Sequence, residues 1–366
     1  FGSKGRKVAA LAELAQHYVD NPSLPYTRLD EAIRQEFPWW VPEKLSYIPW
    51  RSTIRSQSWE TIFGWNTTGL VICAGDGQAW EAAHLISTLR NVINSKLPIE
   101  VAYAGDQDLS PTTREFLANT SSEVHFVDLT QIFDDHVVGL SGWAMKSFAI
   151  VASRFARTIL VDADTVFFFA PDTIFSTYPG LRETGALFFH DRFTTSSWSY
   201  KAPARRGWVA AELIATQRAA SVHLNTSSLF YREYTTEEAD SAMVVIDKSQ
   251  AKLYLATLFA AWMNTKYIRD FTYDMFHGDK ETYWLATELS GATYSFEPWS
   301  AAIMAEDDSS ESIAEHLGKK CTEHMAHATA DGTEPFWANG AIWKDIKRKD
   351  LSFVNWTHWF LGSRID

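Results

Sequence analysis

Two aspartates that follow an apolar run are the strongest chemical signal in this sequence. Thr158 and three apolar residues lead directly into Asp162-Ala163-Asp164, and further apolar residues follow. In an extended chain, residues two apart point to the same side, so both carboxylates face one way. Two negative charges in apolar surroundings repel each other and are poorly solvated, and a hard divalent cation with oxygen ligands relieves both problems. We therefore favour metal binding over the alternative, a pair of aspartates that only turn or cap the chain.

A second pair with the same spacing, Asp106-Gln107-Asp108, serves as a comparison. It precedes Leu109-Ser110-Pro111 in a polar stretch, and no apolar strand runs directly into its first aspartate. Ser followed by Pro is typical of the first turn of a helix. We interpret this comparison pair as a cluster at the start of a helix.

The segments around Asp162 alternate between strand and helix patterns. Strands are predicted at residues 69–74, 99–104, 124–129 and 158–161, and helices at 78–93, from 110 and at 146–154. Further on, we predict strands at 186–189 and 242–246 and helices at 252–263 and 279–289. Such alternation predicts an α/β fold with a doubly wound, mostly parallel sheet flanked by helices. Ligands of these sheets bind beyond the carboxyl ends of the strands.

The N-terminal part of the chain has a different pattern. Helices are predicted at residues 7–19 and 28–35, and residues 37–65 are rich in Trp and Pro without clear periodicity. We interpret residues 1–65 as a helical appendage that packs on a catalytic domain formed by residues 66–366.

Composition narrows the possible partners. The chain has 366 residues, of which 46% are hydrophobic, and its net charge is −12. An acidic chain argues against nucleic acid or an anionic membrane surface as the main partner, because both require a basic face. A small polyanionic ligand held by a metal or by a few local cations remains possible.

Glycosylation acceptor patterns indicate the secretory pathway. They occur at Asn66, Asn119, Asn225 and Asn355. The longest nearly apolar stretch, residues 253–263, is much shorter than the about 20 residues that span a bilayer. The chain begins without Met, so we expect any membrane anchor to lie outside it. Two cysteines, Cys73 and Cys321, are too few for a disulfide framework, and whether they pair is left open.

An Asp-x-Asp motif after an apolar strand is typical of two classes of enzyme. In haloacid-dehalogenase-like phosphatases it supplies the nucleophile and the general acid, and residues 162–166 fit that string. In nucleotide-sugar transferases of the GT-A fold, it holds a metal ion on the donor diphosphate. The phosphatase also needs a Gly-Asp followed by another Asp four or five positions later. Gly278-Asp279 is followed there by Tyr283 and Trp284, which favours the transferase.

Four segments resemble the fungal α-mannosyltransferases of glycosyltransferase family 71. They are residues 141–149 (SGWAMKSFA), 160–165 (LVDADT), 271–284 (FTYDMFHGDKETYW) and 327–340 (HATADGTEPFWANG), within a resemblance over about residues 66–345. The family consists of Golgi type II membrane enzymes with α-1,2 and α-1,3 members. Its enzymes use GDP-mannose, usually with Mn²⁺, and retain the anomeric configuration. One departure is Asp240-Ser241-Ala242, where the family pattern continues with Ser-Gly after the acidic residue.

The resemblance implies a ligand set for Mn²⁺. Asp162 and Asp164 would bind the metal, which bridges the two phosphates of the donor. His327 resembles the third protein ligand, because it stands upstream of Pro335-Phe336-Trp337 where the family has a His before a Pro-x-Trp. His324 is the competing candidate.

Other residues would bind the donor. Lys146 is a lone cation in an apolar stretch, which suits either a contact to the nucleotide phosphates or a surface lysine that snorkels. Gly75 and Asp76 follow the first strand of the α/β pattern and could approach the nucleoside. Asp191 and Arg192 follow a strand, and either face the donor sugar or form a structural ion pair.

Three aspartates are candidates for the reaction itself. The resemblance suggests that Asp279 binds donor hydroxyls or assists acceptor deprotonation, whereas its alternative role is to cap a helix. Asp240 and Asp191 are the other acidic residues expected near the anomeric carbon. None has an obvious activating partner in the sequence, so we expect front-face attack rather than a covalent mannosyl-enzyme.

The sequence as a whole leads to one expectation. We expect an Mn²⁺-dependent retaining α-mannosyltransferase of the GT-A fold in the Golgi lumen, which transfers mannose from GDP-mannose to a mannosylated glycan. A haloacid-dehalogenase-like phosphatase that uses Asp162 and Asp164, or a non-catalytic sugar-binding protein, are the alternatives. The linkage, the choice between N- and O-glycans and the oligomeric state are left open.

Overall fold

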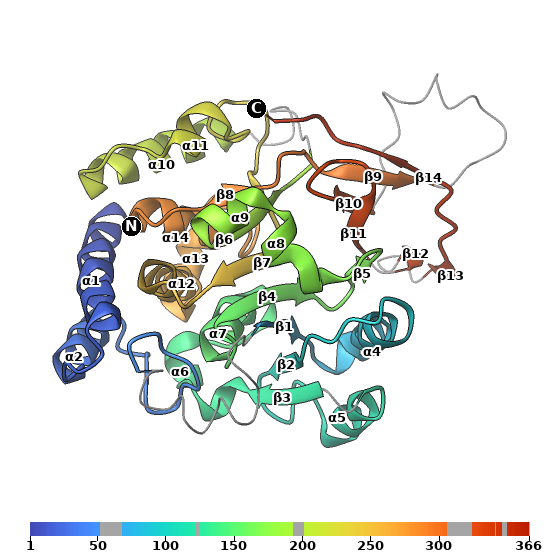
Figure 1. Cartoon of the computed structure of the whole chain (residues 1–366), viewed down its shortest axis with the longest axis horizontal. Helices are drawn as coiled ribbons and strands as arrows, with labels where there is room; N and C mark the ends of the chain where they lie inside the picture. The colour runs from blue at the N-terminus through green and yellow to red at the C-terminus, as the bar shows by residue number, and fades with distance from the viewer. Residues whose placement is uncertain are drawn as a thin grey trace.

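A computed structural model describes residues 1–51, 68–121, 124–192, 201–305, 324–340, 342–345 and 350–365 of the chain (Figure 1). Its central sheet has seven strands in the order β3-β2-β1-β4-β7-β6-β8. These strands are β1 (Thr68–Cys73), β2 (Ile99–Tyr103), β3 (Val124–Asp128), β4 (Arg157–Asp162), β6 (Ala186–His190), β7 (Ala239–Asp247) and β8 (Ser295–Phe296). β1 is parallel to β2 and β4, β2 to β3 and β6 to β8, whereas β7 is antiparallel to both of its neighbours. The expected mixed, mostly parallel α/β sheet is confirmed.

Helices cover both faces of this sheet. They are α1 (Gly2–Asp20), α2 (Thr27–Glu36), α4 (Ala79–Ser87), α5 (Pro111–Ala118), α6 (Asp135–Val138), α7 (Met145–Ala152), α8 (Ile174–Thr177), α9 (Pro179–Thr184), α10 (Ala202–Thr216), α11 (Val222–Thr226), α12 (Ala251–Met263), α13 (Lys266–Met275) and α14 (Thr282–Ser290). Short helical turns lie at η1 (Asp76–Gln78), η2 (Thr88–Val92), η3 (Leu129–Gln131), η4 (Gly142–Ala144) and η5 (Pro171–Thr173). In the parts of the chain that are described, no helix combines the length and apolar character needed to cross a membrane.

The central strands are apolar along their length because both faces are covered. Successive residues of a strand point to opposite faces. On one face Val71 and Leu160 join a core with α7, α12 and α14. On the other face Leu70 and Ile159 join a core with α4, α8 and α9. Continuous apolar runs such as 69–74 are therefore the pattern that this position in the sheet requires.

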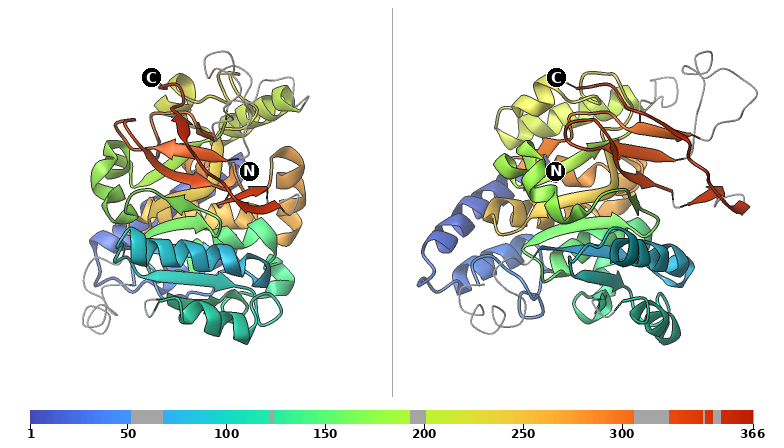
Figure 2. Two further views of the ribbon diagram at one scale, coloured as in Figure 1. Left: turned by 90° about the vertical axis from the view of Figure 1, so that its right-hand side faces the viewer. Right: turned by 45° about the vertical axis from the view of Figure 1, so that its right-hand side comes forward.

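A second sheet, which the sequence did not predict, stands beside the first. Its strand order is β14-β9-β10-β11-β5, and all of its pairings are antiparallel. The strands are β5 (Val166–Phe167), β9 (Ala302–Ala305), β10 (Met325–Ala328), β11 (Pro335–Asn339) and β14 (His358–Phe360), and a separate hairpin pairs β12 (Trp343–Asp345) with β13 (Asp350–Phe353). Figure 2 shows these C-terminal strands in orange and red gathered on one side of the molecule.

The N-terminal helices belong to the same hydrophobic core as the sheet. Val8 and Ala12 of α1 and Ile33 of α2 are buried in a cluster with α12 and α14. After α2, the buried Trp40 donates an indole hydrogen bond to Tyr254 Oη of α12 at 3.0 Å. The expectation that this segment packs on the main domain fits these contacts. The proposed boundary near residue 65 lies outside the described residues, as do Asn66 and Cys321.

Gly5 allows α1 to approach α14 closely. A Cβ atom at this position would lie only 2.4 Å from the backbone oxygen of Leu289. In an exposed helix, Gly→Ala stabilises by about 0.5–1 kcal/mol through helix propensity. Here we expect Gly5→Ala to lower the free energy of unfolding by about 1–3 kcal/mol, because the two backbones must move apart.

Chemical denaturation measures this change, with Ser3→Ala on the exposed side of α1 as the matched control. The control should be neutral or slightly stabilising. An increase in stability for Gly5→Ala similar to that of the control would show that α1 does not pack on α14.

Candidate active site

The topology of the central sheet brings the predicted site residues to one edge. β4 ends at Asp162, and β6 ends at His190, directly before Asp191. β7 runs in the opposite direction, and its first residues, Ala239 and Asp240, pair with the end of β6. The carboxyl ends of β4 and β6 and the start of β7 therefore lie side by side. This is the edge at which α/β sheets bind ligands.

A buried lysine lies at the centre of the candidate site. Lys146 Nζ is 2.5 Å from Asp162 Oδ1 and 3.8 Å from Asp279 Oδ2. It also donates a hydrogen bond to the backbone oxygen of Ser241 at 3.3 Å. Burial alone would lower the pKa of this ammonium group, but the negative charges of Asp162 and Asp279 raise it above its usual value. Lys146 is thus a charged internal group rather than a snorkelling surface lysine.

Burial and mutual repulsion act on the acidic pair, Asp162 and Asp164. The pKa of Asp164 is raised to about 7 by burial and by the negative charge of Asp162, while Lys146 acts in the opposite direction. A hard divalent cation binds carboxylate oxygens and would favour the ionised form of both groups. Within the described part of the chain, however, no three His, Cys, Asp or Glu side chains converge as metal ligands do. The pair fits a metal as two donors of an incomplete set.

Asp279 is held by side chains rather than by a helix end. Its carboxylate accepts hydrogen bonds from Tyr283 Oη at 2.8 Å and from Ser241 Oγ at 3.2 Å. The predicted helix start at 279 is wrong, because α14 begins at Thr282 and its N-cap residue is Glu281. The capping role considered for Asp279 is therefore also wrong.

His327 is enclosed by two carboxylates. Its Nε2 lies 3.2 Å from Asp240 Oδ2, its Nδ1 contacts Glu297 Oε1, and its ring stacks on Trp337 with 4.3 Å between centroids. Burial would lower the pKa of His327, but the carboxylates outweigh it and raise the pKa to about 9. Burial would likewise raise the pKa of Asp240, but His327 and Lys280 lower it to about 2. The two carboxylates thus favour the charged form of His327.

A histidine that binds a metal ion is neutral, and one of its two ring nitrogens must be available to the ion. Both nitrogens of His327 contact carboxylates in this arrangement, so its role as third ligand stays a prediction. The competing His324 lies just before β10. Its Nε2 is 3.0 Å from the backbone oxygen of Trp343, and its ring packs against Trp356.

Lys280 is a site residue that the sequence reasoning missed. Its Nζ is 2.6 Å from Asp191 Oδ2, and Asp191 and Asp240 raise its pKa despite its burial. Asp191 also accepts a hydrogen bond from the backbone N–H of Arg192 at 2.7 Å, while Arg192 Nε lies 3.8 Å away. The main cation beside Asp191 is therefore Lys280, and its position next to Asp279 in the sequence was the available signal.

Gly75 and Asp76 lie on the β2 side of the edge. The exposed Asp76 accepts a hydrogen bond from the backbone N–H of Ser110 at 2.9 Å. Gly75 lies against Asp108, where a Cβ atom would be 2.5 Å from the carboxylate. The comparison pair is part of the turn before α5, since Ser110 is the N-cap of that helix and Asp106 forms an ion pair with Arg114 at 2.8 Å.

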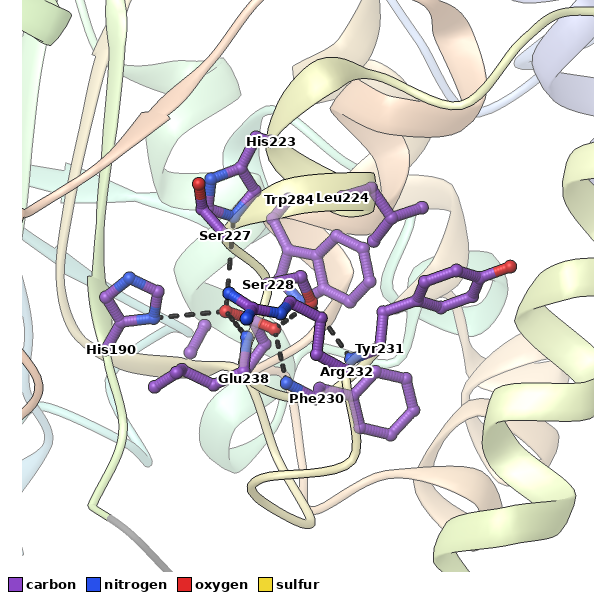
Figure 3. Close-up of polar contacts among 12 residues, drawn as sticks. His190, His223, Leu224, Ser227, Ser228, Phe230, Tyr231, Arg232, Glu238 and Trp284 are labelled. Carbon is purple, nitrogen blue, oxygen red and sulfur yellow. Dashed lines mark hydrogen bonds and ion pairs between the residues drawn. The ribbon is translucent and has the colours of Figure 1, made fainter. Parts of the chain in front are cut away.

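The buried carboxylate of Glu238 connects His190, at the end of β6, with the segment around Phe230 (Figure 3). Glu238 accepts hydrogen bonds from the backbone N–H groups of Leu229 at 3.1 Å and Phe230 at 2.8 Å. His190 Nδ1 lies 3.0 Å and His223 Nε2 4.0 Å from the same carboxylate oxygen. The backbone oxygen of Glu238 accepts from the N–H of Asp191 at 3.0 Å. Glu238 therefore joins the end of β6 to the start of β7.

His223 makes the free energy of unfolding of the protein depend on pH. Burial and the nearby His190 lower the pKa of His223 from 6.5 to about 4, although Glu238 opposes the shift. As the pH falls through this range, the unfolded chain takes up a proton at His223 before the folded protein does, so the free energy of unfolding decreases.

We expect His223→Phe to remove this dependence while keeping the stacking on Phe296, whose ring is 4.8 Å from that of His223. Between pH 7.5 and pH 4.5 the variant should lose about 2 kcal/mol less stability than the wild-type protein. Denaturant unfolding of both proteins at each pH measures the difference. Identical pH dependence would show that His223 titrates normally in the folded protein.

Comparison with known proteins places these features in a family. Residues 67–329 match the mannosyltransferase family Mannosyl_trans3. The chain is similar to two proteins of Saccharomyces cerevisiae. It is 25% identical over 303 residues to "Probable alpha-1,3-mannosyltransferase MNT4", and this alignment covers 76% of the present chain and 50% of that protein. It is 24% identical over 281 residues to alpha-1,3-mannosyltransferase MNT3, and this alignment covers 68% of the present chain and 42% of that protein.

The chain thus spans about half the length of the curated relatives that it matches. Among solved structures, it aligns with the mannosyltransferase Ktr4p from S. cerevisiae at a TM-score of 0.39 and 10% identity, over 64% of this chain and 68% of that one. The family match covers well over half of the present sequence. The chain therefore belongs to the mannosyltransferase family that its four sequence segments indicated.

Proposed function

We propose that this chain is a metal-dependent, retaining α-mannosyltransferase that transfers mannose from GDP-mannose to a mannose-containing glycan. The observation that carries the proposal is the meeting of Lys146, Asp162 and Asp279 at the carboxyl edge of the sheet. An internal cation beside an acidic pair suits a ligand that carries both a diphosphate and a metal ion. The residues come from three of the four segments on which the family resemblance was based.

In this proposal Asp162 and Asp164 hold a divalent cation, for which Mn²⁺ is the expected choice. The ion would neutralise charge on the departing diphosphate. Lys146 contributes a second positive charge beside Asp162. Arg192 and the Gly75–Asp76 turn are the further candidates for contacts with the donor.

The surroundings of the acidic candidates favour front-face transfer. An attacking carboxylate needs an oxygen atom directed at the anomeric carbon. Both oxygens of Asp279 accept side-chain hydrogen bonds, and Asp240 is engaged by His327 and by the backbone N–H of Ala242. Asp191 is engaged in the same way by Lys280 and Arg192. We infer that the leaving phosphate accepts the acceptor proton, while the remaining lone pairs of Asp279 and Asp240 accept hydrogen bonds from sugar hydroxyls.

We also propose that the protein acts in the Golgi lumen. Three of its glycosylation acceptor sites, Asn119, Asn225 and Asn355, are exposed on the surface. The acidic net charge of −12 argues against nucleic acid as a partner.

The first test of the proposed function concerns the acidic pair. Asp162→Ala or Asp164→Ala should reduce mannose transfer from GDP-mannose by about 100-fold or more, because the departing diphosphate loses charge stabilisation. Asp106→Ala in the comparison pair is the matched control and should leave most of the activity. Release of GDP in the presence of Mn²⁺ measures activity, and thermal unfolding checks that each variant is folded.

Loss of activity in Asp106→Ala but not in Asp162→Ala would reverse the assignment. Hydrolysis of an aryl phosphate by the wild-type protein, without release of GDP from GDP-mannose, would support the phosphatase instead. Binding of sugar without either reaction would support a non-catalytic protein.

A second test asks whether His327 is a metal ligand or only the partner of two carboxylates. His327→Ala should raise the Mn²⁺ concentration for half-maximal activity sharply, and His324→Ala should change it much less. Because His327 also balances buried charges, Glu297→Gln is a further control that weakens the ion pair but keeps the ring. Equal Mn²⁺ requirements in His327→Ala and Glu297→Gln would remove His327 from the ligand set.

A further inference from the structure

An exposed tryptophan lies close in the chain to Lys146, which contacts Asp162 and Asp279. Trp143 of η4 is 52% exposed, and its ring centroid is 5.3 Å from that of the exposed His277. Gly278 lies beneath the six-membered part of the indole, where a Cβ atom would be 2.6 Å from the ring. Gly278 also has a φ of +67°, so its conformation and its closeness to Trp143 both favour glycine. The indole thus packs closely against Gly278 while Trp143 remains half exposed to solvent.

Both aromatic residues are attached to the chain segments that form the site. Trp143 stands three residues before Lys146, about one helical turn, and His277 stands two residues before Asp279. These segments meet where Lys146 Nζ lies 3.8 Å from Asp279 Oδ2. A ligand that contacts Trp143 would therefore also lie close to the proposed reaction centre.

The hydrogen bonds of Asp76 and Asp279 place the two predicted parts of the site along the sheet edge. Asp76 follows β1 and bonds to Ser110 on the β2 side of the edge. Asp279, two residues after His277, bonds instead to Ser241 at the start of β7, on the other side of β4. Through Asp279, the aromatic pair is linked to Ser241 at the start of β7.

We propose that Trp143 is a stacking platform for the terminal hexopyranose ring of the acceptor glycan, with His277, whose ring is tilted by 47° to the indole, beside it. A pyranose has an apolar C–H face that packs on an indole, and its hydroxyl groups can bond to the imidazole nitrogens. The proposal rests on the proposed transfer to a glycan. It adds the residues that recognise the acceptor, as distinct from those that bind the donor.

Kinetics with methyl α-mannopyranoside as the acceptor test the platform. In Trp143→Ala we expect the KM for this acceptor to rise about 10-fold relative to the KM for GDP-mannose, as expected for the loss of one aromatic stack. Trp143→Phe should recover most of the affinity, because it restores an aromatic face. The matched control is Trp80→Ala in α4, where the side chain is 72% exposed and packs on Phe116 of α5.

Two kinetic outcomes would overturn the proposal. A rise in the KM for GDP-mannose without a larger rise for the acceptor would assign Trp143 to the nucleoside. An unchanged acceptor KM in Trp143→Ala would show that the ring binds no acceptor.

If the wild-type protein releases no GDP with any acceptor, the proposed transferase function fails on its own. The platform is then tested by saturation-transfer NMR of methyl α-mannopyranoside with the same variants. A signal lost in Trp143→Ala and kept in Trp80→Ala supports the platform. Equal signals in both variants and in the wild-type protein overturn it.

Discussion

A buried ammonium group balances the carboxylates that the fold collects at one edge of its sheet. Lys146 reaches from α7 to Asp162 at the end of β4 and to Asp279 before α14, so one cation connects three segments. Removing one partner of a buried charge pair is costly, because the other charge is left in a medium of low polarity. The same rule applies along the edge, where Lys280 balances Asp191 and His327 balances Asp240. The acidic pair is the place where this balance is incomplete.

The central sheet was predictable from the sequence because its strands carry a strong local signal. Strands buried on both faces need continuous apolar runs, and the runs at residues 69–74 and 158–161 became β1 and β4. The second sheet had no such signal. Its strand β5 has two residues and pairs with β11, far away in the chain, so the pairing rather than the local pattern determines it. The start of α14 was misplaced because Asp279 bonds to Ser241 and Tyr283 instead of capping the helix.

The aspartates of the candidate site were found from the sequence, whereas most of their partners were not. Asp162, Asp191 and Asp240 stand beside strand patterns, which marks them as unusual. Lys280 and Glu297 carry no such mark, since a charged residue in a mixed segment usually faces solvent. Only the fold shows that they lie against Asp191 and His327. Sequence spacing also could not show that both nitrogens of His327 would meet carboxylates.

The acidic pair occupies the short link between the two sheets. β4 is clamped between β1 and β7 of the central sheet, and β5 begins at Val166 and pairs with β11 in register Trp337 to Phe167. Because both ends of this short link are fixed by strand pairing, its backbone has little conformational freedom. The positions of its carboxylates therefore depend on the angle between the two sheets. A substitution on the far side of β11 can therefore retune the spacing of the two carboxylates without touching either. Sequence changes in the second sheet can therefore alter the geometry of the acidic pair at the edge of the first sheet.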